Sequence, residues 1–336
     1  MNHLSNKALF IAWIKYQRRA ASMQPYFGYE LKYVPITVKI KSLKIVDYVI
    51  KLLRTVFYLL KYRPKIFWIQ LPPTFLTNIA ILYNKILRNK MVIIADCHNG
   101  VFWGIWEKYL NANKLNKSDI IIVHNWAIKD VAISKGVDES KIMILETKPA
   151  TKNLDDVAVS QKSVRPQVMM PCAFDPDEPL EVVFEAARKI PEVDIFVSGP
   201  KERGEPLFDY SKKPDNVHLI GYLSKKDYET TFLQSELILG LTTEDHVQLS
   251  VANEATGFEI PMVISDTKLL RDLFNKGAVY VETLNADSIA DGIKEALQNI
   301  DSLREEVRIL KKERNQKWEN MAAALKERIE ILTSKN

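Results

Sequence analysis

The sequence predicts an α/β protein of two doubly wound domains, each built on a mainly parallel sheet. The chain has 336 residues, which is more than one ordinary domain needs and enough to bury two cores. Short apolar runs rich in β-branched residues recur along it and are followed by polar or glycine-containing segments. Segments of helical length separate these runs. Because strand and helix alternate in both halves, we expect two Rossmann-like domains.

The first half alternates four apolar runs with four helical segments. We expect strands at residues 8–14, 66–71, 91–95 and 120–123. We expect helices at residues 43–60, 74–87, 101–111 and 128–135. The polar stretch 157–167 breaks the pattern and ends in Arg165-Pro166, so it is the best candidate for a linker. The first domain is therefore predicted to span residues 1–160.

The second half repeats this pattern and ends in a charged tail. We expect strands at residues 168–171, 194–198, 217–220, 237–241, 262–265 and 279–281. We expect helices at residues 180–189, 225–234 and 251–256. The tail 288–331 is predicted to be helical, and its apolar positions do not hold a heptad for long, which argues against a free coiled coil. A second domain over residues 161–305 and a terminal segment over 306–336 follow.

Composition excludes several classes of protein. Hydrophobic residues make up 47% and charged residues 26% of the chain, which is typical of a globular protein. No apolar stretch approaches the roughly 20 residues of a membrane-spanning helix. Residues 8–14 lack a small-residue cleavage site and are interpreted as a strand, so we expect a cytoplasmic protein. Cys97 and Cys172 are too few and too far apart for a disulfide framework or a paired-cysteine metal site.

Basic residues gather in one part of the first domain. Between Lys32 and Lys65 the chain has nine lysines and arginines and one acid, Asp47. An aromatic-rich apolar segment, residues 46–60, lies among them and carries Lys51 and Arg54. Such a segment suits a helix that lies on an anionic membrane surface. A core helix with a solvated basic face is the alternative; nucleic acid binding is disfavoured because no known binding motif is present.

Residues 239–266 contain the pattern that builds a ligand site at the carboxyl edge of a parallel sheet. An apolar run is followed by a polar loop, a helix and a second apolar run. The helix carries Glu254 about one and a half turns from its start. A carboxylate there is placed to accept two ribose hydroxyls, while loop amides and the helix amino terminus face a diphosphate.

These residues resemble the carboxyl-terminal domain of GT-B glycosyltransferases, the family 4-like "group 1" enzymes. That family's motif has a Glu, seven further residues and a second Glu followed by Ala, then Gly-x-Pro before a strand. Glu254-Ala255 and Pro261 fit this motif. His246 replaces the first Glu, which puts the donor-sugar contact in doubt, and Glu259 replaces the Gly, which suggests a locally different turn. The resemblance implies two Rossmann-like domains that face a cleft, with a last helix that crosses back to the first domain.

Two ionisable side chains follow the strand at residues 91–95. Asp96 and His98 lie where an α/β site collects its polar groups. In the resembling family a His at a comparable strand end lies close to donor sugar and acceptor, and His98 matches it. Either side chain is a candidate catalytic group, and Asn99 is a candidate contact for acceptor or phosphate. The alternative is that Asp96 caps the next helix and His98 is a packing residue.

Candidate anion contacts lie on three loops. Arg18 and Arg19 follow the first strand, where the family's loop contacts phosphate or acceptor; a solvated surface pair is the alternative. The family's Arg and Lys that neutralise donor diphosphate are replaced here by the acidic turn 173–178, whose acids also suit the start of a helix. Positive charge would come instead from the loop at Gly199, which carries Lys201 and Arg203.

The remaining donor candidates come from the loop before Glu254 and from one turn. Thr243, His246 and Gln248 offer a hydroxyl, a ring and an amide. Gly221-Tyr222 resembles the family's turn near the nucleotide base, so Tyr222 completes the donor set. No metal-ligand spacing stands out, and we expect no metal and no cofactor apart from the donor substrate.

We therefore expect a metal-independent glycosyltransferase that moves a hexose from a nucleotide diphosphate to a hydroxyl acceptor. The resemblance favours a retaining reaction, although Asp96 as a base would permit inversion. If the basic segment meets a membrane, a lipid-linked or cell-surface polysaccharide acceptor is the best substrate class. Two other hypotheses stay open: a non-catalytic GT-B partner or scaffold subunit, and a nucleotide-sugar epimerase that needs no acceptor.

Overall fold

The computed structural model describes residues 8–38, 40–87, 91–150 and 165–334, which form two compact units. Unit 1 comprises residues up to Lys148 together with those from Lys317 onward, and unit 2 comprises Pro149–Gln316. The division after Lys148 precedes the expected boundary at residue 160. That boundary and most of the expected linker lie outside the described residues.

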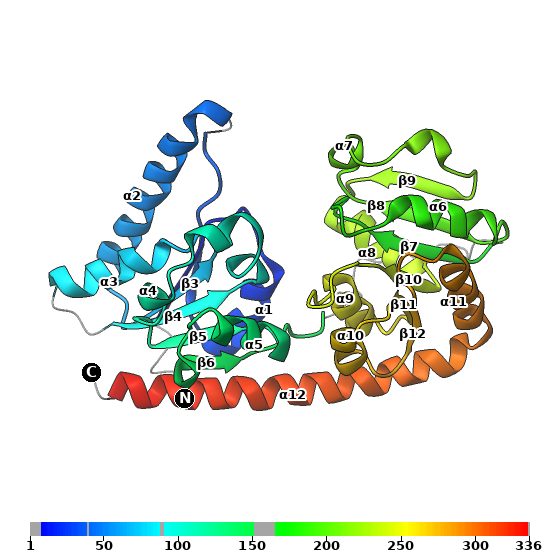
Figure 1. Cartoon of the computed structure of the whole chain (residues 1–336). Helices are drawn as coiled ribbons and strands as arrows, with labels where there is room; N and C mark the ends of the chain where they lie inside the picture. Colours follow the sequence, from blue (N-terminus) through cyan, green and yellow to red (C-terminus); the bar gives the residue numbers. More distant parts are fainter. Residues whose placement is uncertain (1–7, 39, 88–90, 151–164, 335–336) are drawn as a thin grey trace. The chain divides into compact units, whose positions relative to one another are not determined.

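Unit 1 is a parallel six-stranded sheet with helices on both faces (Figure 1). The strand order is β2-β1-β3-β4-β5-β6. The strands are β1 (Ala8–Ala12), β2 (Glu30–Tyr33), β3 (Ile66–Leu71), β4 (Val92–Cys97), β5 (Ile120–Val123) and β6 (Ile142–Ile144). The helices are α1 (Arg18–Phe27), α2 (Lys44–Tyr62), α3 (Leu76–Leu87), α4 (Ala112–Leu115) and α5 (Trp126–Ser134).

Alternate side chains of these strands enter two separate cores. Phe10, Trp68 and Ile94 pack on one face of the sheet, where they meet helix α1. Leu9 and Ile69 point to the other face, where α2, α3 and α5 pack. Both faces are covered, which is why the strands are nearly continuous apolar runs rather than alternating ones.

Unit 2 is a second parallel six-stranded sheet, with order β12-β11-β10-β7-β8-β9. Its strands are β7 (Gln167–Pro171), β8 (Asp194–Ser198), β9 (Val217–Gly221), β10 (Leu237–Gly240), β11 (Met262–Ser265) and β12 (Ala278–Val281). Its helices are α6 (Leu180–Arg188), α7 (Lys201–Gly204), α8 (Lys225–Gln234), α9 (Ser250–Phe258), α10 (Lys268–Leu273) and α11 (Ala286–Gln298). The expected α/β class is confirmed in both units.

The strand orders locate the ligand crevice of each unit. In a doubly wound sheet, ligands bind beyond the carboxyl ends of the two strands between which the chain changes direction. In unit 1 the chain passes from β1 to β2 on one side and then to β3 on the other, so this point lies between β1 and β3. In unit 2 it lies between β7 and β10.

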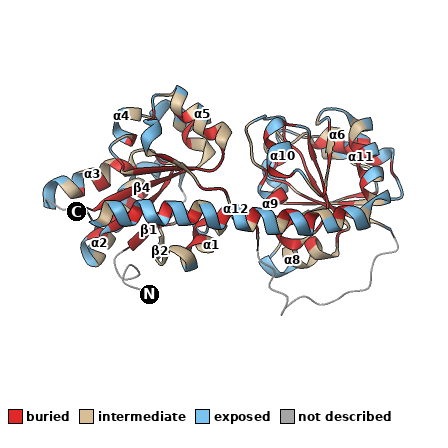
Figure 2. Ribbon diagram, turned by 90° about the horizontal axis from the view of Figure 1, so that it is seen from below, coloured by how far each residue is buried: buried red, intermediate tan, exposed pale blue. Residues whose placement is uncertain are grey.

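A single long helix, α12 (Ile300–Ser334), contributes to both units. Its amphipathic pattern appears as a regular alternation of buried and exposed residues in Figure 2. From Lys317 onward it belongs to unit 1, where Trp318, Ala322 and Leu325 are buried in the same core as Phe10 and Trp68. The expected return of the terminal helix to the first domain is therefore confirmed.

Helix α2 is amphipathic, but it buries mainly polar side chains and exposes apolar ones. The face turned toward unit 1 buries Asp47, Lys51 and Thr55, and the Lys51 ammonium lies 3.0 Å from the Asp47 carboxylate. Trp13 donates to the Thr55 hydroxyl at 2.9 Å. The outer face instead exposes apolar side chains at helical spacing: Ile45, Val49, Leu52, Leu53, Phe57 and Leu60. Lys51 therefore serves the interior of unit 1 and is not on the outer face.

Several elements differ from expectation. Residues 99–101 and 104–109 form two short 3₁₀ helices where one α-helix was expected at 101–111. Strands β2 and β6 were missed, because β2 is a partly exposed edge and β6 has only three residues. Arg18 and Arg19 were expected on a loop, but they begin α1. The loop with Lys201 and Arg203 forms the single-turn helix α7.

Replacing Trp318 by Ala should destabilise unit 1 by about 3–5 kcal/mol, because a large, fully buried ring is removed and a cavity is left. Urea denaturation followed by a unit 1 probe measures this. Glu319→Ala, at the next and exposed position, is the matched control and should change stability by less than about 0.5 kcal/mol. A Trp318→Ala protein as stable as this control would show that α12 does not complete the unit 1 core.

Candidate functional site

The predicted site residues form two groups, one at the carboxyl edge of each sheet. The unit 1 group is built around a buried ion pair. Asp96 is the second-last residue of β4 and is fully buried. The Arg19 guanidinium approaches both of its oxygens, with Nε 3.3 Å from Oδ2 and Nη2 3.3 Å from Oδ1. Arg19 also donates to the carbonyls of Leu145 at 2.8 Å and Glu146 at 3.0 Å.

This arrangement determines the ionisation of Asp96. Burial alone would raise the pKa of Asp96, but the Arg19 guanidinium and the adjacent His124 hold that pKa well below its ordinary value. The carboxylate is therefore ionised at neutral pH. Because Arg19 commits four N–H groups to buried acceptors and is itself buried, the expectation that it reaches out to an external anion does not fit its position. Arg18, at the first position of α1, is half-buried.

His98 lies just beyond β4, beside a second histidine that follows β5. The rings of His98 and His124 meet edge-on with centroids 4.6 Å apart. Gln17, from the loop after β1, hydrogen-bonds through its amide nitrogen to Nε2 of His98. Since an amide N–H donates, this Nε2 accepts and the ring proton is on Nδ1. The pKa of His98 is lowered to about 3, mainly by burial and then by the adjacent His124 and Arg19, while Asp96 opposes the shift.

Sequence reasoning missed three members of this group. His124 and Asn125 directly follow the strand at residues 120–123, so the same rule that selected Asp96 and His98 applies to them. Asn125 caps α5 through a bond from Ile128 N of 2.9 Å, whereas His124 Nε2 lies 3.6 Å from Asp96. Gln17 gave no signal, because only folding brings it to His98. Asn99 is half-buried, and its side-chain oxygen, Oδ1, has no hydrogen-bond partner among the described residues.

The same side chains could hold a divalent metal ion. Asp96, His98 and His124 offer ligand atoms that all lie within 4.8 Å of one another. The sequence spacing did not reveal this set because the ligands come from two strands. Arg19 already occupies the Asp96 carboxylate, so a cation would have to compete with a bound guanidinium. We keep metal independence as a prediction.

The unit 2 group lies at the change of direction between β7 and β10. Thr242, directly after β10, donates its hydroxyl to Asp177 at 2.7 Å, and its amide donates to Ser265 Oγ at 2.8 Å. The Thr243 amide donates to the Asp177 carbonyl at 2.9 Å, which leaves its side chain exposed. The loops that follow β7 and β10 are thereby joined at the point where a doubly wound sheet binds its ligand.

The acidic turn after β7 is held together by its own carboxylates. Glu178 accepts hydrogen bonds from the amides of Ala173 at 3.2 Å and Asp175 at 3.1 Å. Burial raises the pKa of Glu178, and these two bonds oppose that shift. Asp175 pairs with Arg203. All three acids of this turn therefore have a structural partner, as expected for residues that organise a loop and begin a helix.

Gly199 is required by its surroundings. Its φ of +146° is a conformation that other residues rarely adopt, and a Cβ here would lie 1.9 Å from the Cys172 carbonyl oxygen. Its amide donates to Gly221 at 2.9 Å. The backbones at the ends of β7, β8 and β9 thus come close together. The next turn exposes Tyr222 almost completely, with 85% of its surface accessible.

Glu254 is placed on α9 as predicted, and it is half-buried in an otherwise nearly buried helix. Tyr228 of α8 donates its hydroxyl to the Glu254 carboxylate, which fixes the direction of this side chain. Gln248, just before α9, has neither amide atom bonded within the described chain. The His246 ring lies 3.7 Å from Glu244, so a carboxylate lies beside the position where the family motif has its first Glu.

Glu259 takes the conformation that the missing glycine would take. Its φ of 61° is left-handed, and it ends α9. Its carboxylate lies 2.7 Å from the Lys311 ammonium. An ion pair thus accompanies a backbone conformation that is unfavourable for a residue other than glycine.

Comparison with known proteins relates unit 2 to one family. Residues 156–316 match the model of the family "Glycosyl transferases group 1". This match lies within unit 2, which is therefore similar to the group 1 glycosyl transferases. A search of curated protein sequences found no significant match to the chain.

Solved structures extend the likeness from the matched region to nearly the whole chain. Alr3699/HepE from Anabaena, in complex with UDP-glucose, has a TM-score of 0.71 at 11% identity, covering 96% of this chain and 99% of that one. A glycosyltransferase from Rickettsia africae has 0.69 at 14%, covering 98% and 99%. Sucrose-phosphate synthase from Thermosynechococcus elongatus has 0.68 at 14%, covering 98% and 89%. The chain therefore has the GT-B fold.

Lowering the pH should destabilise unit 1. Burial depresses the pKa of both His98 and His124, so below about pH 6.5 the unfolded chain binds protons that the folded chain does not. Between pH 7 and 5.5 His98 should lower the unfolding free energy by about 1 kcal/mol, and His124 should add to this loss. Urea denaturation measures this, and His124→Asn should reduce the pH dependence. Ring-nitrogen NMR that shows His98 titrating near pH 6.5 would contradict the neutral site.

Proposed function

We propose that this protein transfers a hexose from a nucleoside diphosphate to a hydroxyl group of an acceptor. One observation carries the proposal: unit 2 is similar to a group 1 domain, and its Glu254 stands on α9, directly after the loop that leaves β10. A carboxylate held by Tyr228 in that place suits the two adjacent hydroxyls of a ribose. The solved structure of HepE with UDP-glucose supports a nucleotide-sugar donor.

The amino terminus of α9 supplies the diphosphate contact in this proposal. Its N-cap residue, Leu249, makes no side-chain cap, so the first amides of the helix remain available to an anion. Lys201 and Arg203 add positive charge near Gly199. Arg203 is paired with Asp175, but the two side chains are 57% and 36% exposed, and such pairs contribute only about 0–1 kcal/mol. Arg203 can therefore exchange this carboxylate for a phosphate at little cost.

The other donor candidates keep their predicted roles. Thr243 and Gln248 offer polar groups at the entrance to α9, and His246 stands near the donor sugar. Tyr222 is exposed for stacking against the base.

In unit 1 we assign His98 to the reacting centre. A neutral ring whose orientation is fixed by Gln17 can accept or donate a hydrogen bond to a sugar hydroxyl without adding charge. Asp96 is fully buried, so we assign it a positioning role: it holds Arg19 and His124 rather than touching substrate. This favours a retaining, metal-independent reaction, because a base for inversion would need access to the acceptor. Arg18 and Asn99 remain candidates for an acceptor or phosphate contact.

Thermal unfolding against nucleoside diphosphates and nucleotide sugars tests the donor site, because a ligand that binds only the folded state raises the midpoint. A shift with one nucleotide identifies the base. No shift with any of them would leave the non-catalytic GT-B partner as the better hypothesis. Turnover of a donor to a new sugar isomer without an acceptor would instead favour the epimerase.

Glu254→Ala should weaken nucleotide-sugar binding by roughly 10- to 100-fold, since it removes charge-assisted hydrogen bonds. His98→Ala should leave donor affinity unchanged and lower turnover by about 10²-fold or more. Calorimetry and an initial-rate assay, run with and without EDTA, measure both effects and the metal independence. Asp245→Ala, an exposed acid in the same loop, is the control. Unchanged donor affinity in Glu254→Ala would remove the central assignment.

We further propose that the protein works at the cytoplasmic surface of an anionic membrane, on a lipid-linked or cell-surface polysaccharide precursor. Among the described residues no helix is long and apolar enough to cross a bilayer. The outer face of α2 instead offers exposed apolar side chains, with Ile45 77%, Leu53 62% and Phe57 58% accessible. Lys44, Arg54 and Lys61 are exposed on the same helix, and its one acid is buried. Apolar and basic groups without acids suit an anionic bilayer.

Two variants distinguish the apolar and the electrostatic contributions to membrane binding. Ile45, Leu53 and Phe57 changed to Ser should abolish vesicle binding at any salt concentration, because each buried side chain supplies about 1.5–3 kcal/mol. Lys44, Arg54 and Lys61 changed to Glu should abolish it mainly at low salt, since each cation supplies about 1 kcal/mol and is screened.

Sedimentation with phosphatidylserine-containing vesicles measures the binding. The same change of charge at Lys225, Lys268 and Lys312, all exposed in unit 2, is the control and should leave it unchanged. A wild-type protein that ignores these vesicles would end the membrane proposal.

A further inference from the structure

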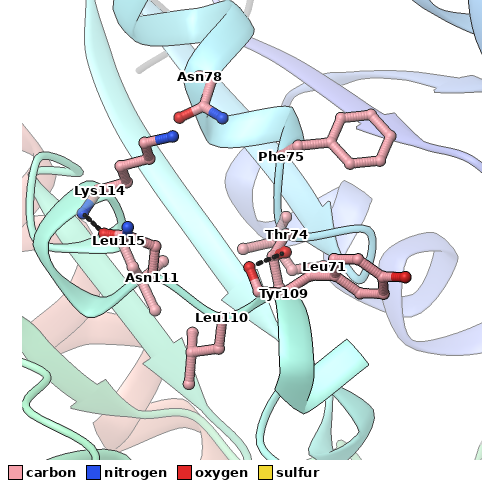
Figure 3. A pocket seen from close by; sticks show the side chains of 9 residues that line it. All are labelled: Leu71, Thr74, Phe75, Asn78, Tyr109, Leu110, Asn111, Lys114 and Leu115. Atoms are coloured by element: carbon pink, nitrogen blue, oxygen red, sulfur yellow. Dashed lines mark hydrogen bonds between the residues drawn. The ribbon is translucent and has the colours of Figure 1, made fainter. Parts of the chain in front are cut away.

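A pocket of about 160 Å³ lies on the α3 face of the unit 1 sheet (Figure 3). Leu71, the last residue of β3, and Leu115 of α4 form part of its wall. Phe75, just before α3, and Tyr109 add two aromatic rings. None of the residues discussed for catalysis or donor binding lines this pocket.

The pocket lies beside the carboxyl end of β3, one of the two strands between which the chain of unit 1 changes direction. The chain changes direction between β1 and β3, and Leu71 and Phe75 come from the segment that leaves β3. Phe75 meets Trp13, from the loop after β1, with ring centroids 5.6 Å apart. The Leu71 carbonyl accepts the His98 amide at 2.9 Å. The pocket wall and the candidate reacting centre are thus joined by one backbone hydrogen bond.

Two polar groups project toward the pocket from opposite sides. Asn78 of α3 and Lys114 of α4 point toward one another in Figure 3. Within the described part of the chain, neither the Asn78 amide nor the Lys114 ammonium makes a hydrogen bond or ion pair. Their neighbours are committed: Thr74 donates to the Tyr109 carbonyl at 3.0 Å, and Asn111 accepts from the Lys114 backbone at 3.0 Å. The scaffold is therefore fixed, and an amide and a cation are left for a ligand.

The size and lining of the pocket define the ligand. A cavity of about 150 Å³ holds a single six-membered ring. Aromatic walls suit the apolar face of a sugar, an amide suits its hydroxyls, and an ammonium suits a phosphate. Along α3 the face that carries Asn78 continues at helical spacing with Leu82 and Ile86, which are 54% and 67% exposed. A hydrocarbon chain attached to that phosphate would find an apolar path leading away from the pocket.

We propose that this pocket is the acceptor subsite and that it binds the sugar phosphate head of a lipid-linked acceptor. The proposal deepens the glycosyl transfer proposed above and rests on it. Lys114 holds the phosphate, Asn78 holds a sugar hydroxyl, and the sugar ring rests against the apolar part of the lining, which includes Leu71, Phe75 and Leu115. The lipid follows Leu82 and Ile86.

Binding of a soluble sugar 1-phosphate to the full chain tests the head-group contact without any enzymatic assay. Saturation-transfer NMR should show binding that Lys114→Glu weakens about tenfold or more and Lys114→Arg largely restores. Lys117→Glu, an exposed lysine one turn away that does not line the pocket, is the matched control. Equal binding by the Lys114→Glu and Lys117→Glu proteins would overturn the proposal, because any signal would then come from a phosphate site elsewhere, such as Lys201 and Arg203.

Steady-state kinetics with a lipid-linked sugar phosphate separates this subsite from the donor site. Lys114→Glu and Asn78→Leu should raise the KM for this acceptor about tenfold and leave the nucleotide-induced thermal shift unchanged. The acceptor without its lipid should bind more weakly in wild type, and Leu82→Ser with Ile86→Ser should remove only that difference. A Lys114→Glu protein with wild-type acceptor KM overturns the subsite while glycosyl transfer stands; a wild-type chain without a nucleotide shift overturns both.

Discussion

The ion pair between Arg19 and Asp96 is the constraint on which the carboxyl edge of the unit 1 sheet depends. It joins the start of α1, the end of β4 and the segment after β6, because Arg19 also bonds to Leu145 and Glu146. Both charges are out of water, so removing either partner would leave an uncompensated buried charge and cost about 3–5 kcal/mol. His98 and His124 are placed against this pair. Their neutrality follows from the same burial, and so does the fixed geometry that a reacting centre needs.

The pair between Arg203 and Asp175 in unit 2 has the opposite character. Both side chains are substantially exposed, and an exposed pair contributes about 1 kcal/mol or less. The two arginines therefore have different roles. The buried Arg19 fixes the positions of its neighbours, whereas the exposed Arg203 can exchange Asp175 for another anion. The sequence placed both among candidate anion contacts, because residue type alone does not reveal burial. The difference in free energy decides which of them can meet a phosphate.

Much of the fold was predictable, because parallel strands buried on both faces are apolar runs that stand out from the helices between them. Glu254 and His98 were also predictable, since each follows a strand by a fixed local pattern. The sequence did not predict which other residues contact Glu254 and His98. Gln17 reaches His98 across 81 positions, and Tyr228 reaches Glu254 across 26. Such contacts depend on the order of strands in the sheet, which local periodicity does not encode.

Helix α2 shows the same limit more sharply. Its composition suited either a helix on a membrane surface or a core helix with a solvated basic face, but composition does not say which face is buried. Here Asp47 and Lys51 neutralise one another inside, and the Thr37 amide adds a bond of 2.7 Å to Asp47, so the polar face is the one that packs. The packed face also buries Leu59, and within the described residues the apolar outer face stays largely exposed. Keeping this apolar surface in water costs about 25 cal/mol per Å² relative to burying it. Because the helix also carries exposed cations, an anionic membrane is the surface that best buries it. Exposed apolar residues of α3 lie on the same unit and continue toward the pocket. Membrane contact and binding of the acceptor lipid would therefore both depend on exposed apolar side chains of unit 1.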